Sequence, residues 1–268
     1  MKISHECPIS IFDKVQKLTH YDYCLVHLFQ ENEEYRRHFL EAKLKKREII
    51  LDNSIFELGV AFNSERYAKV VQELQPDWYI VPDVLEDSKA TIQSYKKFCK
   101  TYKDLPGKKI GVIQGKSFEE LEECYRELVL TGVDKIAISF DYSYYLELSK
   151  DVVSTNEYRF IIGRQRFLKK FIQSATFLSN SKSFHLLGCF LPQEFQIYKT
   201  KEFQGVEIDS VDTSNPVVHG LKYIPYTNTG LLTKESQKLF TLINSEVNQE
   251  QLSIIESNII QFRKFCNE

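Results

Sequence analysis

Short apolar runs alternate with longer charged segments along most of the chain. The runs are about five residues long and rich in β-branched side chains, a pattern typical of strands buried on both faces of a parallel sheet. We expect an eighth strand around Leu221–Tyr226, a segment that contains Pro225, which weakens the prediction. The seven clearer runs are Cys24–Phe29, Glu48–Asp52, Trp78–Pro82, Lys109–Gln114, Lys135–Ser139, Phe184–Gly188 and Gly205–Asp209.

The segments between these runs predict helices. Asn32–Lys46 and Asp87–Tyr102 are charged and amphipathic, and Ser117–Leu130 opens with a serine followed three residues later by a glutamate, a capping-box pattern. Gly132 is placed to end that helix. Repeated strand–helix units in a chain of this length predict an α/β fold, a (β/α)8 TIM-like barrel, with an open doubly wound sheet as the alternative. We expect one domain over residues 1–268 with a helical C-terminal tail from about residue 234.

Composition narrows the functional classes. The chain of 268 residues is 43% hydrophobic and 27% charged, with 10 Gly and 7 Pro, which is typical of a folded globular protein. It has no apolar run long enough to span a membrane and no apolar signal core at its N-terminus, so we expect a cytoplasmic protein. A net charge of −2 excludes a globally basic nucleic-acid coat but not a local basic patch.

Sequence motifs for common cofactors and metals are absent. Six scattered cysteines form no C-x-x-C pair, which argues against a zinc site and against a disulfide framework. The chain contains neither G-x-G-x-x-G nor G-x-x-x-x-G-K-[ST], so no dinucleotide or P-loop nucleotide is expected. We therefore predict no cofactor and no metal.

Polar residues follow several of the expected strands. Active sites of (β/α)8 barrels are built at the carboxyl ends of the strands, and carboxylates or amides stand there at Asp52, Asp83, Gln114 and Asp209. A carboxylate and an amide together can read the hydrogen-bonding edge of a purine, and a second carboxylate can attack an anomeric carbon. The alternative for each aspartate is a helix cap or turn residue.

Five short stretches carry a resemblance to a known family. They are similar, in chain order, to the motifs D-S-G-G-F-Q, G-I-V-Q-G, G-x-D-G-x-A, Y-L-M-G and F-D-C-V through H-G of the tRNA-guanine transglycosylases. The resemblance runs from about residue 48 to residue 220. The stretches are Leu51–Glu57, Gly111–Gly115, Gly132–Ala137, His185–Gly188 and Ile208–Val211 continued to His219–Gly220.

The departures from that family indicate a branch of it. The family's C-x-C-x-x-C and histidine zinc site is absent, and the P-T-R after its nucleophile is replaced by Asp212–Pro216. Small zinc-free relatives of this kind resemble the phage DpdA-type enzymes, which exchange guanine in DNA for a 7-deazaguanine base as a means of restriction evasion. The resemblance implies DNA and a 7-deazaguanine base, 7-cyano-7-deazaguanine or a derivative, as substrates. If phage-encoded, the protein is expected in the cytoplasm of the infected host cell.

The resemblance also implies roles for individual residues. Asp52 is expected to be the general acid and base that serves the leaving and entering purine. Asp209 is the nucleophile by ungapped alignment, and Asp212 is its rival. The substrate-binding set comprises the residues of the purine edge, the two that sandwich the base, and those near its 7-position: Asn53, Asp83, Gln114, Phe56, Leu187, Gly188 and Ser139. For Phe56, packing in the core is an equally good interpretation.

The most basic stretch lies between the expected fifth and sixth strands, with Tyr158, Phe160 and Phe167 among its cations. Phosphate contacts and an aromatic wedge would suit nucleic-acid binding, whereas a solvated helix face is the alternative. A tRNA substrate, a non-catalytic nucleic-acid-binding subunit and a barrel enzyme acting on a small nucleoside remain competing hypotheses. The residues expected to contact nucleic acid are Arg159, Arg164, Arg166, Lys169 and Lys170.

Overall fold

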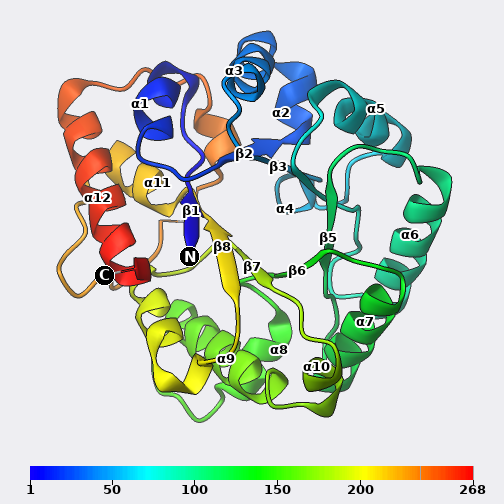
Figure 1. Ribbon diagram of the computed structural model, residues 1–268. Coiled ribbons are helices and arrows are strands. Elements are labelled where there is room, and N and C mark those ends of the chain that lie inside the picture. Colours follow the sequence, from blue (N-terminus) through cyan, green and yellow to red (C-terminus); the bar gives the residue numbers. More distant parts are fainter. Residues whose placement is uncertain (236, 268) are drawn as a thin grey trace. The chain divides into compact units, whose positions relative to one another are not determined.

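The chain folds as an α/β protein with eight parallel strands that form a (β/α)8 barrel, seen in a computed structural model that describes residues 1–235 and 237–267 (Figure 1). The strand order β1-β8-β7-β6-β5-β4-β3-β2 is the sequential order of such a barrel. The predicted fold class is therefore confirmed. The strands are β1 (Lys2–Ser4), β2 (Asp22–Leu25), β3 (Ile49–Asp52), β4 (Trp78–Ile80), β5 (Lys108–Val112), β6 (Lys135–Ile138), β7 (Phe184–Leu187) and β8 (Ile208–Asp212).

Two compact units make up the chain. We call Tyr21–Ile138 with Ala175–Phe184 the central unit, and Met1–His20, Ser139–Ser174 and His185–Glu268 the terminal unit. Each is described below by itself, and the single-domain organisation stays a prediction.

In the central unit, three predicted helices are confirmed, and each begins at a polar cap. The side chains of Asn32, Asp87 and Ser117 accept hydrogen bonds from the backbone N–H groups of Tyr35, Ala90 and Glu120. Helices α5, α6 and α7 lie in chain order on the outer side of the strands (Figure 1). The helices are α2 (Val26–Glu31), α3 (Glu33–Leu44), α4 (Ile55–Leu58), α5 (Ser64–Leu74), α6 (Ser88–Thr101), α7 (Phe118–Leu130) and α10 (Ala175–Ser179).

The core of the central unit lies between these helices and β2–β6. Tyr67 and Tyr79 are fully buried and pack against Phe98 of α6, with ring centroids 6.0 and 6.3 Å from it. The Tyr67 hydroxyl donates to the Leu51 carbonyl oxygen, so the polar end of this large side chain is satisfied inside the core. Parallel pairing aligns Leu25 with Asp52 and Leu51 with Tyr79, which places the ends of β2, β3 and β4 close together.

In the terminal unit, β1 pairs with β8 in parallel, with Ile3 opposite Val211 and Ser4 opposite Asp212. Gly220 of α11 allows close contact with Ile255 of α12. The helical elements are η1 (Ile9–Ile11), α1 (Phe12–Gln16), α8 (Ser143–Leu148), α9 (Asn156–Phe171), η2 (Pro192–Lys199), η3 (Lys201–Phe203), α11 (Asn215–Leu221), η4 (Leu239–Leu242) and α12 (Gln249–Asn267).

Three strand predictions need correction. The run Cys24–Phe29 is strand only to Leu25 and then turns into α2, because periodicity cannot separate a buried helix from a buried strand in a short apolar run. The remaining strand is β1, whose three residues are too few to give a periodic signal, and Leu221–Tyr226 is not a strand. Finally, β8 spans Ile208–Asp212 and therefore ends three residues after the predicted end at Asp209.

Gly163 generates a stability prediction. A Cβ at this position of α9 would collide with the backbone and Cβ of Tyr145 in α8. Gly163→Ala should therefore lower the free energy of unfolding by about 1–3 kcal/mol, although alanine is normally the better helix residue. Urea denaturation measures the change, and Lys97→Ala on an exposed face of α6 is the control, expected within about 0.5 kcal/mol of the wild type. An unchanged or increased stability for Gly163→Ala would contradict this packing.

Candidate functional site

A buried carboxylate joins the ends of three successive strands in the central unit. Asp83, three residues after β4, accepts a hydrogen bond from Asn53 Nδ2 on Oδ1 at 2.7 Å and one from Gln114 Nε2 on Oδ2 at 2.6 Å. Asn53 directly follows β3, Gln114 lies two residues after β5, and all three side chains are buried. The structure thus brings together three residues of the predicted substrate-binding set.

The orientation of both amides is set by further hydrogen bonds. Gln114 Oε1 accepts from the Glu86 backbone N–H at 2.9 Å, and Asn53 Oδ1 accepts from the Ile55 backbone N–H at 3.0 Å. Each amide therefore turns its NH2 group toward Asp83. Burial raises the pKa of Asp83 from 3.8 to about 6, and the hydrogen bonds from Gln114 and Asn53 oppose this rise. The carboxylate consequently changes its charge near pH 6.

Asp52 is the last residue of β3 and has two donors of its own. The Tyr23 hydroxyl donates to Oδ1 at 2.9 Å, and the Ser54 backbone N–H donates to Oδ2 at 2.5 Å. The two bonds fix the plane of the carboxylate. Tyr23 is not among the predicted site residues, because a tyrosine in β2 carries no signal that it will meet an aspartate 29 residues later. Phe56 lies in α4 with 43% of its surface exposed, so it is not a core residue.

The terminal unit holds the two rival aspartates on opposite faces of β8. Side chains alternate along a strand, so Asp212 and Ser210 share one face and Asp209 points to the other. Asp212 Oδ1 lies 3.1 Å from His185 Nε2, and His185 Nδ1 lies 3.0 Å from Ser210 Oγ. Asp212 ends the strand and is buried, whereas Asp209 is its second residue. The structure therefore gives Asp212, and not Asp209, the position at the carboxyl end of β8.

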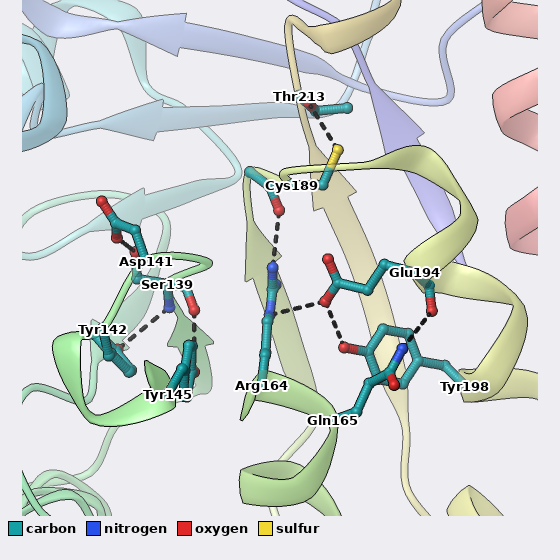
Figure 2. Close-up of polar contacts among 11 residues, drawn as sticks. Ser139, Asp141, Tyr142, Tyr145, Arg164, Gln165, Cys189, Glu194, Tyr198 and Thr213 are labelled. Atoms are coloured by element: carbon teal, nitrogen blue, oxygen red, sulfur yellow. Dashed lines mark hydrogen bonds and ion pairs between the residues drawn. The ribbon is translucent and has the colours of Figure 1, made fainter. Parts of the chain in front are cut away.

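Ser139 and Gly188 lie in the terminal unit after β6 and β7. Ser139 Oγ donates to Asp141 Oδ1 at 2.6 Å, and its carbonyl oxygen accepts from the Tyr145 hydroxyl (Figure 2). Gly188 has φ +59°, and a Cβ there would lie 2.6 Å from the ring of Phe140. Only glycine fits this backbone without strain. Leu187 ends β7 and is partly exposed.

The prediction that Arg164 contacts nucleic acid is wrong. Its side chain is completely buried, donates to the Gly188 carbonyl oxygen at 2.9 Å and lies 3.6 Å from Glu194 (Figure 2). The Tyr198 hydroxyl donates to the same Glu194 carboxylate at 2.6 Å. Arg164 lies on the buried face of α9. Its place in the helical repeat turns it inward, although the stretch as a whole is basic. It holds the backbone just after β7 in place.

The other basic residues of α9 lie nearer the surface. Arg159 donates to the Leu146 carbonyl oxygen at 2.9 Å. Arg166 pairs with Asp151 at 2.5 Å and Lys169 with Glu202 at 3.1 Å, both between exposed side chains, and Lys170 is exposed. Exposed ion pairs are worth little, so phosphates can compete for these cations. Nucleic-acid binding by these four residues stays a prediction.

Within residues 1–235 and 237–267, no group of three or more His, Cys, Asp or Glu side chains is arranged to hold a metal ion. Over the same residues, none of the helices has the length and apolar character needed to cross a membrane.

The comparisons with known proteins show the fold. No protein-family model and no curated protein sequence matches the chain. A candidate fructose-1,6-biphosphate aldolase of Coccidioides immitis has a similar structure, with a TM-score of 0.50 and 13% identity over 96% of this chain and 88% of that chain. N-acetylneuraminate lyase of Mycoplasma synoviae gives a TM-score of 0.46 and 12% identity over 83% and 74%. Both structural neighbours are named as enzymes, and the likeness to the first shows a TIM-like barrel.

The raised pKa of Asp83 predicts a pH dependence of stability. Because its folded-state pKa of about 6 lies above the ordinary 3.8, folding favours the protonated form. The stabilisation is complete below about pH 4 and is lost as pH rises through 6, a fall of about 3 kcal/mol for a shift of roughly 2 pH units. Asp83→Asn should remove this fall, measured by urea denaturation between pH 4 and 7.

Asp104→Asn supplies the control, because Asp104 lies in an exposed turn and should leave the pH dependence unchanged. If Asp83→Asn showed the same fall as the wild type, the buried carboxylate would not be its source.

Proposed function

We propose that the chain is a base-exchange glycosyltransferase that replaces guanine in DNA with a 7-deazaguanine derivative. The observation that carries this proposal is the Asp83 carboxylate held between the amides of Asn53 and Gln114. Guanine presents N–H donors at N1 and N2 next to an acceptor at O6. A carboxylate accepts from the donors, and the second N–H of the Gln114 amide is suited to donate to O6.

The same recognition explains why two bases can use one site in turn. A 7-deazaguanine differs from guanine at position 7 and keeps the edge formed by N1, N2 and O6. A group that reads this edge therefore accepts both the leaving and the entering base, which a base exchange requires. Because the pKa of Asp83 is about 6, its carboxylate is ionised at neutral pH, as an acceptor for two N–H groups must be.

Proton transfer is assigned to Asp52. Both of its oxygens accept hydrogen bonds, from the Tyr23 hydroxyl and from the Ser54 N–H, so the carboxylate is held in one orientation. A fixed acid or base of this kind can protonate the purine as it leaves and take a proton from the purine that enters. The exposed ring of Phe56, four residues later, is suited to stack on the base.

The nucleophile of the proposal is Asp212. An Asp212 oxygen forms a bond to C1′ of the nucleotide, the bond from C1′ to N9 of guanine breaks, and Asp52 supplies the proton to guanine. N9 of the entering base then loses its proton to Asp52 and attacks C1′, and the ester bond to Asp212 breaks. Two displacements retain the configuration at C1′. The target nucleotide has to leave the base stack first, since its C1′ is otherwise out of reach.

Two further parts of the proposal are the role of His185 and the choice of DNA as the nucleic acid. His185 lies 3.1 Å from Asp212 and orients it as a nucleophile. The sequence resemblance to the phage DNA-modifying enzymes favours DNA over tRNA. Arg159, Arg166, Lys169 and Lys170 are the proposed phosphate contacts, while Leu187, Gly188 and Ser139 would surround position 7 of the base.

The choice of Asp212 over Asp209 gives a direct test. Single-stranded DNA is incubated with labelled guanine, and label in the DNA reports exchange. Asp212→Asn should reduce the rate at least about a thousandfold, as loss of a nucleophile does, and should abolish the covalent adduct between protein and DNA on a denaturing gel. Asp209→Asn, on the opposite face of β8, should stay within about tenfold of the wild type.

Two outcomes would contradict this proposal. Absence of exchange and of adduct with the folded wild-type protein would overturn the proposed reaction. Full activity of Asp212→Asn together with an inactive Asp209→Asn would leave the reaction intact and return the nucleophile to Asp209.

A further inference from the structure

His27 makes a contact that the proposed reaction does not use. It lies in the first turn of α2, directly after β2, and its Nδ1 is 2.8 Å from Ser54 Oγ. Its backbone N–H also points to the same oxygen, at 3.4 Å. Both side chains are buried. The first N–H groups of a helix have no acceptor within that helix. The Ser54 hydroxyl supplies one such acceptor to α2.

Ser54 has an unusual backbone conformation. Its φ of 59° and ψ of 24° lie in the left-handed region, which is costly for a residue with a Cβ and natural for glycine. The Ser54 N–H donates to Asp52 Oδ2 at 2.5 Å, so the position of Ser54 decides where this donor stands. The following N–H, of Ile55, meets Asn53 Oδ1 at 3.0 Å. The left-handed turn at Ser54 directs the Ile55 N–H to Asn53, and the Ser54 N–H holds Asp52, so both side chains at the end of β3 depend on how Ser54 is held.

The hydrogen-bond pattern indicates which way the protons point. Burial lowers the pKa of His27 below its ordinary 6.5, so the ring is neutral at pH 7. With Oγ accepting from the His27 N–H, the Ser54 hydroxyl donates to Nδ1, an assignment that follows from the network. The hydroxyl is then engaged on both sides and cannot rotate without losing a hydrogen bond in a buried place.

We propose that His27 is a positioning residue that locks Ser54 in its left-handed conformation and thereby holds the Asp52 carboxylate in the orientation for proton transfer. The geometric part stands on the contacts alone, and the catalytic part rests on the proposed function. His27 touches neither the base nor the sugar in this scheme. Its effect passes through Ser54 to Asp52.

A double-substitution cycle with Ser54→Gly tests the proposal. Glycine adopts φ near +60° without strain, so it should make the lock unnecessary. His27→Ala alone should lower kcat for guanine exchange about 10-fold to 100-fold with little change in KM, because the base is read by other residues. In the Ser54→Gly background, His27→Ala should cost less than about threefold. His27→Asn is the matched control, since its side-chain oxygen can accept from Ser54 in place of Nδ1.

Two outcomes of the activity measurements would contradict the proposal. If His27→Ala is equally damaging in the wild-type and Ser54→Gly backgrounds, or if it raises KM and leaves kcat unchanged, His27 does not act through the Ser54 conformation. Activity of the double variant above that of His27→Ala alone cannot arise from a packing role, because Ser54→Gly removes atoms and restores no lost contact.

Thermal unfolding tests the lock without any assay of function. His27→Ala should lower Tm by several degrees more in the wild-type background than in the Ser54→Gly background. If the wild type exchanges no base, the proposed function fails, and this cycle still decides whether the lock exists. Equal losses of Tm in the two backgrounds would overturn it.

Discussion

The hydrogen bonds from Asn53 and Gln114 to the buried Asp83 carboxylate are the interaction on which the central unit's site depends. They connect residues that follow β3, β4 and β5, so three strand ends are held by one group. Burying a carboxylate is costly unless its oxygens are satisfied, and here both oxygens accept hydrogen bonds. The remaining cost appears as a pKa raised to about 6. Stability alone does not require a carboxylate at this position, and for this reason we propose that Asp83 binds the base.

In the terminal unit, too, buried charged groups lie next to the ends of strands. Asp212 ends β8 beside His185, and the residues after β7 are held by a second buried charge, the guanidinium of Arg164 on the Gly188 carbonyl oxygen. The Glu194 carboxylate lies 3.6 Å from this guanidinium and balances its charge, so the pair is tolerated inside the protein. Glycine at position 188, with φ +59° and the Phe140 ring close by, leaves no room for a side chain. Backbone shape and buried charge thus fix the strand ends that the proposal uses.

Much of the fold could be predicted from the sequence, and the limits have physical causes. Strand ends at Asp52 and near Asp83 and Gln114 followed from apolar runs, because buried parallel strands are almost uniformly apolar. The end of β8 did not, since Ile208–Asp212 contains two aspartates and a serine and has no apolar run. Contacts across many residues, such as Tyr23 with Asp52 and His27 with Ser54, leave no local pattern. Arg164 looked like a surface cation because composition does not reveal which helix face is buried.

The most direct test of base exchange compares two nucleic acids. Purified protein is incubated with 7-cyano-7-deazaguanine and either guanine-containing DNA or unmodified tRNA, and both are digested to nucleosides for mass spectrometry. The proposal predicts a 7-deazaguanine deoxynucleoside from the DNA sample alone. A modified nucleoside from the tRNA sample alone would contradict the choice of DNA. No product in either sample, with the protein folded, would contradict base exchange itself.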